Sequence, residues 1–195
     1  MEQYKNGYEV IAIGGSWGGM DALISILKGI EAACFLPIVV VLHRNRITES
    51  NLSDILKKYL KLKVKEIDEK ESISCGTVYL APRNYHVLIE KDHTFSLCAS
   101  EAINYARPSI DVMFESIAEV YREKVVGVLL TGANSDGSAG LKQIAANGGL
   151  TIVQDPEDAE SPNMPRSALK IMKPDFVLPQ ININKFLKEL IVKSA

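Results

Sequence analysis

An apolar segment that breaks into four glycines around one serine constrains the fold more than any other stretch of the sequence. Residues 10–13, Val-Ile-Ala-Ile, form a short apolar run with β-branched residues, which is typical of a buried strand. Gly14-Gly15-Ser16-Trp17-Gly18-Gly19 follows, and apolar residues then recur at helical spacing over residues 20–27. A strand, a glycine-rich turn and a helix in this order place a side chain at the carboxyl edge of a sheet.

The turn itself leaves three interpretations open. Residues 14–18 fit the G-x-S-x-G pattern of a nucleophile elbow, in which glycines tolerate positive φ and let strand and helix approach closely. The start of the following helix would offer free backbone N–H groups to a developing oxyanion. A glycine-rich turn before a helix can instead bind a phosphate or a dinucleotide, and it can also be a plain turn with a surface serine.

Length and composition predict a single domain over residues 1–195 and exclude several function classes. Hydrophobic residues at 47% and charged residues at 24% are ordinary for a globular protein. A net charge of −2 gives no bulk attraction for nucleic acid or an anionic membrane surface. The longest apolar runs, at 35–42 and 125–130, are too short to cross a bilayer. The N-terminus has no apolar signal region, so the expected location is the cytoplasm.

The cysteines give no sign of a disulfide framework or a metal site. Cys34, Cys75 and Cys98 are an odd, scattered set without a C-x-x-C pair or a cysteine–histidine cluster. We expect three buried free thiols. The sequence indicates no metal and no organic cofactor.

The first third of the chain reads as strand, helix, strand, helix, strand. Residues 37–42 predict a strand covered on both faces, residues 50–62 a helix, and residues 63–67 another strand. This order favours a doubly wound α/β fold, a mostly parallel sheet with helices on both faces. Three short strands at 76–81, 85–90 and 94–97 interrupt the pattern, and we expect them to pair as antiparallel hairpins.

The α/β pattern then resumes to the end of the chain. Arg107-Pro108-Ser109 opens a helix that runs to Tyr121, with Pro108 or Ser109 in its first turn. The remaining expected elements are a strand at 125–130, a helix at 141–147, a strand at 150–153, a long acidic and proline-containing loop at 154–165, a helix at 166–172, a strand at 176–178 and a helix at 181–193.

Three apolar strands end in groups that together form a known catalytic set. Ser16, His43 and Asp136 each follow the carboxyl end of a strand, where sites form in open parallel sheets. A hydroxyl, an imidazole and a carboxylate are the parts of a serine nucleophile with its base and orienting acid. Singly, His43 could be a structural histidine and Asp136 could cap the helix after it. Their equivalent positions favour a triad, whereas His86 and His93 read as structural or exposed.

Beyond this pattern, the chain resembles the catalytic domain of the CheB family of chemotaxis protein-glutamate methylesterases. The segments that carry the resemblance keep the family's order over nearly the whole chain. They are Ile-Ala-Ile-Gly-Gly-Ser-Trp-Gly-Gly (11–19), Val-Val-Val-Leu-His-Arg (39–44), Val-Tyr-Leu-Ala-Pro-Arg-Asn-Tyr-His (78–86), Arg-Pro-Ser-Ile-Asp-Val-Met-Phe (107–114), Leu-Thr-Gly-Ala-Asn-Ser-Asp-Gly (130–137) and Val-Gln-Asp-Pro-Glu-Asp-Ala-Glu-Ser-Pro-Asn-Met-Pro (153–165).

The resemblance implies a serine hydrolase that removes methyl groups from glutamate γ-methyl esters on the cytoplasmic helices of a chemoreceptor, and that can also deamidate receptor glutamines. Ser16 matches the nucleophile, His43 the general base and acid, and Asp136 the orienting carboxylate. The order serine, histidine, acid argues against the usual α/β-hydrolase. Backbone amides near Trp17 and Ala133 are the expected oxyanion donors. The resemblance implies no cofactor, and its partners are the receptor and a separate regulatory protein or methyltransferase.

The chain departs from the family in three places. Trp17 stands where the family has a small or hydroxyl residue, directly after the nucleophile. Thr-Gly-Ala-Asn (131–134) replaces the family's Thr-Gly-Met-Gly, so that Ala133 stands for a methionine of the oxyanion region. Only nine residues precede the first expected strand, so we expect no receiver domain in this chain.

Two other functions compete with the esterase. A nucleotide-binding module is disfavoured because Ser16 takes the place of the second glycine of G-x-G-x-x-G, and because the second strand ends in His43 and not in an acid. The other is a catalytically silent homologue that binds receptors or a methyltransferase as a scaffold, which the exchanges at Trp17 and Ala133 keep open.

Overall fold

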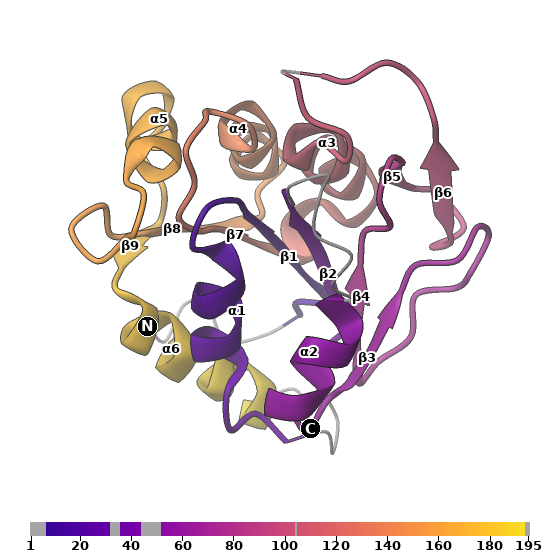
Figure 1. Ribbon diagram of the computed structural model, residues 1–195, viewed down its shortest axis with the longest axis horizontal. Coiled ribbons are helices and arrows are strands. Elements are labelled where there is room, and N and C mark those ends of the chain that lie inside the picture. Colours follow the sequence, from indigo (N-terminus) through magenta and orange to yellow (C-terminus); the bar gives the residue numbers. More distant parts are fainter. Residues whose placement is uncertain (1–6, 32–35, 44–51, 104, 194–195) are drawn as a thin grey trace.

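A seven-stranded sheet forms the centre of the computed structural model, which describes residues 7–31, 36–43, 52–103 and 105–193 (Figure 1). Every pairing between its neighbouring strands is parallel, in the order β3-β4-β2-β1-β7-β8-β9. The strands are β1 (Val10–Gly15), β2 (Ile38–Leu42), β3 (Lys63–Glu66), β4 (Thr77–Leu80), β7 (Val125–Leu129), β8 (Leu150–Gln154) and β9 (Phe176–Leu178).

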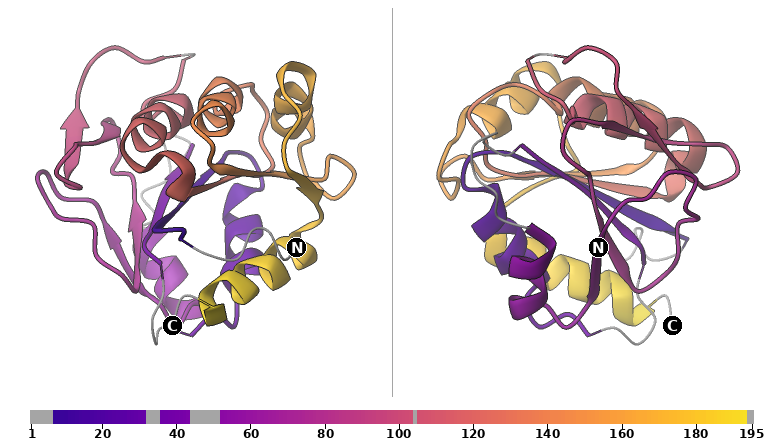
Figure 2. Two further views of the ribbon diagram at one scale, coloured as in Figure 1. Left: turned by 180° about the vertical axis from the view of Figure 1, so that it is seen from behind. Right: turned by 45° about the vertical axis from the view of Figure 1, so that its right-hand side comes forward.

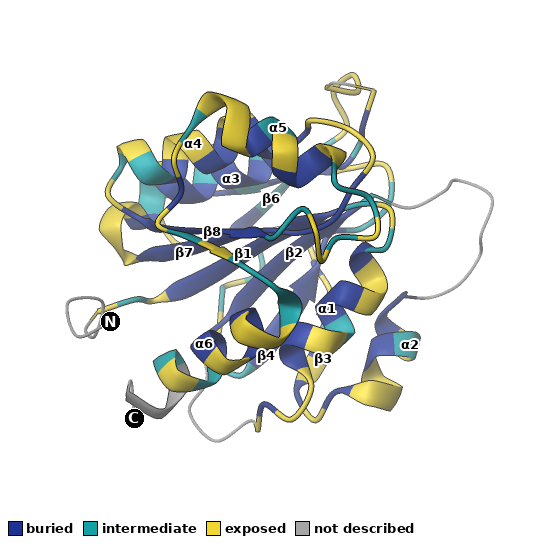
Figure 3. Cartoon of the chain, turned by 90° about the vertical axis from the view of Figure 1, so that its left-hand side faces the viewer, coloured by how far each residue is buried: buried dark blue, intermediate teal, exposed yellow. Residues whose placement is uncertain are grey.

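Helices cover both faces of this sheet, as Figures 1 and 3 show. One face carries α1 (Gly19–Leu27), α2 (Leu52–Tyr59) and α6 (Gln180–Lys193), and the other carries α3 (Ile110–Tyr121), α4 (Ser138–Ala146) and α5 (Asn163–Ile171). A short 3₁₀ helix, η2 (Arg122–Lys124), leads into β7.

The alternation of side chains along the central strand explains the two helical layers. In β1, Ile11 and Ile13 pack with the α1, α2 and α6 side, whereas Val10 and Ala12 pack with the α3, α4 and α5 side. All six residues of this strand are buried. A strand that is apolar on both faces needs cover on both faces, so the prediction of a doubly wound α/β sheet is confirmed.

The middle of the chain differs in part from what the sequence predicts. β5 (His86–Ile89) and β6 (Phe95–Cys98) form the expected antiparallel pair, and β5 packs against α3 (Figure 2). The first of the three short strands, β4, instead lies between β2 and β3 and runs parallel to both. Its four residues are all buried, with Val78 and Tyr79 facing opposite layers, and only an internal strand of the large sheet offers that much cover.

The expectation of buried thiols is wrong for the two cysteines that the structure describes. Cys75 is exposed and Cys98 is partly exposed, and both are free. Cys75 precedes β4 in a turn, and Cys98 ends β6, whose last three residues are all partly exposed. Cys34 lies outside the described residues.

The topology places one end of the sheet in position for a site. β1 lies between β2 and β7, and chain connections on its two sides lead to opposite helical layers. In open parallel sheets, ligands bind where the connections change from one face to the other, beyond the carboxyl ends of the strands. In the part of the chain that the structure describes, no helix is both long and apolar enough to cross a membrane.

Candidate active site

Ser16 lies on the sharp turn between β1 and α1. Its N–H donates to the Thr131 carbonyl at 2.9 Å, and its own carbonyl accepts the N–H of Gly19 at 2.8 Å. Gly18 has a φ of 74° and packs so closely against the Glu160 side chain that a Cβ at this position would lie 2.8 Å from the Cβ of Glu160. The predicted strand, turn and helix are therefore confirmed, and a glycine is required at position 18.

His43 lies beside this turn because β2 pairs with β1. The His43 N–H donates to the Gly15 carbonyl at 3.1 Å, directly before Ser16 in sequence. Both side chains line one cavity of about 810 Å³. Over the described parts of the chain, the cavity is lined by Ser16, Trp17, Leu42, His43, Ala81, Arg83, Asn84, Tyr105, Ala106, Arg107, Pro108, Ala133 and Asn134.

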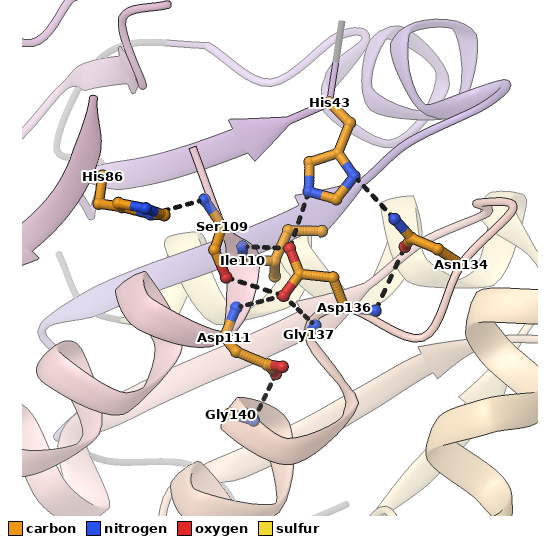
Figure 4. Close-up of polar contacts among 9 residues, drawn as sticks. All are labelled: His43, His86, Ser109, Ile110, Asp111, Asn134, Asp136, Gly137 and Gly140. Carbon is orange, nitrogen blue, oxygen red and sulfur yellow. Dashed lines mark hydrogen bonds and ion pairs between the residues drawn. The ribbon is translucent and has the colours of Figure 1, made fainter. Parts of the chain in front are cut away.

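Asp136 is fully buried next to His43 and accepts five hydrogen bonds (Figure 4). Oδ2 accepts the His43 Nε2–H at 2.8 Å and the Ile110 N–H at 2.7 Å. Oδ1 accepts the Ser109 hydroxyl at 2.9 Å and the N–H groups of Asp111 and Gly137, both at 3.1 Å. The buried carboxylate is thus fully satisfied, as a charge in such a position must be.

These bonds decide the charge of Asp136. Burial alone would raise the pKa of Asp136, but the hydrogen bonds from His43, Ile110 and Asp111 outweigh burial and lower that pKa below its usual value. Asp136 is therefore an anion at neutral pH and can only accept. It follows that Nε2 of His43 carries a proton in this contact, which leaves Nδ1 as the ring nitrogen free to take one.

Asp136 caps a helix, although mainly a different helix from the one that the sequence suggests. It accepts the first two N–H groups of α3, from Ile110 and Asp111, and only the N–H of Gly137 immediately ahead of α4. The positive end of the α3 dipole therefore points at the carboxylate that holds His43. The Asp136 carboxylate thus caps α3 and orients His43 at the same time, so that the helix-cap and triad interpretations of Asp136 do not exclude each other.

Ser109 and His86, which the sequence reasoning did not place at the site, complete the support of Asp136. Ser109 uses its hydroxyl for Asp136 and donates its N–H to Nδ1 of His86 at 3.1 Å. His86 is buried, and its Nε2 donates to the Glu101 carbonyl at 3.0 Å. The interpretation of His86 as structural holds, since it is saturated by these bonds. A serine at the first turn of a helix after Arg107-Pro108 was the available signal for Ser109.

The long loop before α5 ties the serine turn to the turn after β7. The Thr131 hydroxyl donates to the Trp17 carbonyl at 3.0 Å and accepts the Ser161 N–H at 2.8 Å. The Thr131 N–H donates to Oε1 of the buried Gln154 at 2.8 Å. The helix after the loop begins at Asn163, three residues earlier than predicted, because a proline at position 165 is compatible with the first helical turn.

Trp17 and Ala133, the predicted pocket residues, both line the cavity with Ser16. The Trp17 side chain is 65% exposed and Ala133 is exposed as well. Within residues 7–31, 36–43, 52–103 and 105–193, the backbone N–H groups of these two residues donate to no protein acceptor. They are therefore available to a bound oxygen atom. Among the same residues, no group of three or more His, Cys, Asp or Glu is arranged to hold a metal ion.

Comparison with known proteins identifies the family and the fold of the chain. The profile of the family described as CheB methylesterase matches residues 11–187. The chain belongs to the CheB methylesterase family. The crystal structure of the Thermotoga maritima CheB methylesterase catalytic domain superposes with a TM-score of 0.89 at 32% identity, over 95% of this chain and 100% of that one.

Two relatives in sequence give the extent of the family match. A Leptospira interrogans relative is 52% identical over 171 residues, which is 88% of this chain and 89% of the relative. A Carboxydothermus hydrogenoformans protein named protein-glutamate methylesterase/protein-glutamine glutaminase 1 is 40% identical over 181 residues, 90% of this chain and 53% of that protein. The resemblance stated from the sequence is thus confirmed, and the chain spans about half of the second relative.

Proposed function

We propose that this domain hydrolyses glutamate γ-methyl esters on chemoreceptors and releases methanol. The observation that carries the proposal is that Ser16 and His43 line one cavity and that the buried Asp136 bonds His43, in a chain of the CheB methylesterase family. The name of the Carboxydothermus relative supports a glutamate methyl ester as the substrate class.

In the first step, the Ser16 hydroxyl attacks the γ-carbonyl carbon while Nδ1 of His43 takes the hydroxyl proton. The resulting imidazolium is stabilised by Asp136, which is already held as an anion by five donors. The backbone N–H groups of Trp17 and Ala133 donate to the oxyanion of the tetrahedral intermediate.

In the second step, collapse of the intermediate expels methoxide, which leaves as methanol with the proton from His43. Water then attacks the acyl-enzyme, His43 again takes the proton, and free glutamate and Ser16 are regenerated. A glutamine side chain can follow the same route with ammonia as the leaving group. The proposed activity therefore includes deamidation of receptor glutamines.

The partners and the place of action follow from this substrate. We place the reaction at the cytoplasmic helices of a methylated receptor, with a separate regulatory protein or a methyltransferase as further partners. The exposed Trp17 ring and the fully exposed Tyr105 at the cavity would contact a substrate helix. Residues 1–195 are proposed to act as one catalytic domain.

The test is methanol release from methylated chemoreceptor membranes by the wild type and by Ser16→Ala. We expect the variant to lose about 10³-fold or more of the rate, because no other group supplies the nucleophile. Ser25→Ala, an exposed serine on α1, is the matched control and should keep the wild-type rate.

Two outcomes would contradict the proposal. Near-full activity of Ser16→Ala would exclude Ser16 as the nucleophile. No release by either folded protein, together with binding to receptor membranes, would indicate a receptor-binding scaffold.

A further inference from the structure

The side chain of Asn134 bridges the backbone of Asp136 and the ring of His43 (Figure 4). Its Oδ1 accepts the Asp136 N–H at 3.2 Å, and its Nδ2 lies 3.4 Å from Nδ1 of His43. A backbone N–H is always a donor, so the oxygen of the amide must face it. The amide NH₂ is thereby fixed toward the imidazole.

The protonation of His43 follows from both of its neighbours independently. Asp136 can only accept, so Nε2 carries the proton, and the Asn134 amide can only donate from its nitrogen, so Nδ1 carries the lone pair. Both ring nitrogens thus have protein partners. Among the residues that the structure describes, Ser16 forms no side-chain hydrogen bond, so its hydroxyl is not yet joined to the base.

We propose that Asn134 is a positioning residue that caps the Nδ1 lone pair of His43 in the resting protein and releases it to Ser16 when substrate enters. This rests on the proposed function, in which Nδ1 takes the Ser16 proton. Asn134 is exposed and lines the same cavity as Ser16, so a substrate filling the cavity contacts it. At 3.4 Å the hydrogen bond between Asn134 and His43 is long, so breaking it costs little free energy.

The charges around the imidazole make the amide, and not a carboxylate, the suitable cap. Asp136 contacts Nε2, and besides His43 itself, Arg83 and Arg107 supply the acidic or basic side chains of the cavity lining over the residues that the structure describes. A carboxylate at position 134 would face the lone pair directly and would favour a proton on Nδ1. The ring would then be held as an imidazolium between two carboxylates and could not accept the Ser16 proton.

Two substitutions test the cap with methanol release and with a small fluorophosphonate. The probe forms an oxygen–phosphorus bond with Ser16, expels fluoride and sends the hydroxyl proton to His43, so its rate reports activation of the serine. Asn134→Ala should react about two- to tenfold faster than the wild type, the range that one weak neutral hydrogen bond is worth. Asn134→Asp should lose about 10²-fold or more in both reactions, as expected for loss of a general base.

Imidazole ¹⁵N NMR gives a readout that does not depend on turnover. In the wild type we expect His43 with Nδ1 unprotonated and Nε2 protonated, and in Asn134→Asp both nitrogens protonated at neutral pH. Asn147→Ala, at a partly exposed asparagine that bonds a backbone carbonyl at the end of α4, is the control and should behave as the wild type.

Any one of three results would overturn the proposal that Asn134 caps Nδ1. They are a protonated Nδ1 in the neutral wild-type ring, an unprotonated Nδ1 in Asn134→Asp, and an unchanged or slower reaction of Asn134→Ala with the probe. If the wild type releases no methanol and the probe does not label Ser16, the proposed function fails, and the NMR spectra still decide whether Asn134 caps the lone pair.

Discussion

Asp111 and Asp136 are neighbouring buried carboxylates whose surroundings move their pKa values in opposite directions. Burial raises the pKa of Asp111 to about 6 against the hydrogen bond from the Gly140 N–H, and the charge of Asp136 and a hydrogen bond with its side chain add to the rise. Asp136 is buried too, but hydrogen bonds led by that from His43 lower its pKa. The number and direction of donors, and not depth alone, separate the two carboxylates.

This difference predicts a pH dependence of stability that belongs to Asp111. Its folded pKa lies above the usual value of about 3.9, so the folded state keeps a proton that the unfolded state loses. The free energy of unfolding should therefore fall as pH rises from about 4 to about 6, by up to about 3 kcal/mol. Asp111→Asn should remove this fall, since its amide oxygen still accepts the Gly140 N–H. Urea unfolding measures this fall at about pH 4.5, near the lower end of that window, and at about pH 7.5, above its upper end.

The exchange of Asp21, an exposed residue of α1, for asparagine controls for the loss of one carboxylate. Below about pH 4, the wild type and Asp111→Asn should lose stability together, because Asp136 with its lowered pKa takes up its proton there. If Asp111→Asn and the wild type had parallel stability curves from pH 4.5 to pH 7.5, Asp111 would not carry the effect.

The sequence could place single residues at the site better than it could predict their bonds. Ser16, His43 and Asp136 each follow a strand, and strand ends are visible as the limits of apolar runs. The five donors to Asp136 come from the start of α3 with Ser109 before it, from the turn after β7 and from His43, which lies 93 residues before Asp136. Such contacts depend on how α3 packs, and no local pattern contains that information.

At the scale of elements, the place of α3 against β1 sets the position of the donors to Asp136. Gly14 of β1 lies under Ile110 and Phe114 of α3, and a Cβ there would clash with the Ile110 side chain. The N–H of the same Ile110 is the donor at 2.7 Å to Asp136. Close packing at one glycine thus controls the geometry around the carboxylate.

Gly14→Ala should therefore lower both stability and activity. Overpacking should reduce the free energy of unfolding by about 1–3 kcal/mol, and a shift of the α3 N-terminus should lower kcat by about tenfold or more. Gly127→Ala in the neighbouring β7 is the matched control, because its Cβ would meet Ile144 and Leu141 of α4 at 2.7 and 2.9 Å. It should lose similar stability with a smaller change in kcat. If Gly14→Ala and Gly127→Ala lost kcat equally, in assays where both variants are folded, a special role of the α3 packing would be contradicted.

Elements were predictable where a periodic pattern and a local signal agreed, as in α1, β7 and α6. β4 is the exception, because a four-residue strand followed by Pro82-Arg83-Asn84 looks the same before a hairpin and before a crossover. Its parallel place between β2 and β3 is decided by burial on both faces. Burial on both faces of a strand is a property of the whole sheet and not of the local sequence.

At the scale of the whole molecule, the two helical layers contribute differently to the site. The layer of α3, α4 and α5 carries the backbone donors to Asp136 and the loop that holds the serine turn, whereas the described residues of α2 and α6 do not line the cavity. Both layers share one sheet, so loss of packing on either face destabilises the same fold. Stability and activity should therefore separate on the α6 side.

Leu187→Ala tests this separation. Leu187 of α6 is fully buried in the layer that contains α1 and α2, and its truncation leaves a cavity there. We expect the free energy of unfolding to fall by about 2–5 kcal/mol, with kcat for methanol release unchanged at temperatures where the variant stays folded. Urea denaturation and methanol release at one temperature measure the two quantities. A fall in kcat comparable to that of Gly14→Ala would mean that the α6 side communicates with Ser16 through α1, which begins three residues after it. An unchanged kcat would mean that the geometry of the site is set by β1, β7 and α3, with the opposite layer contributing stability alone.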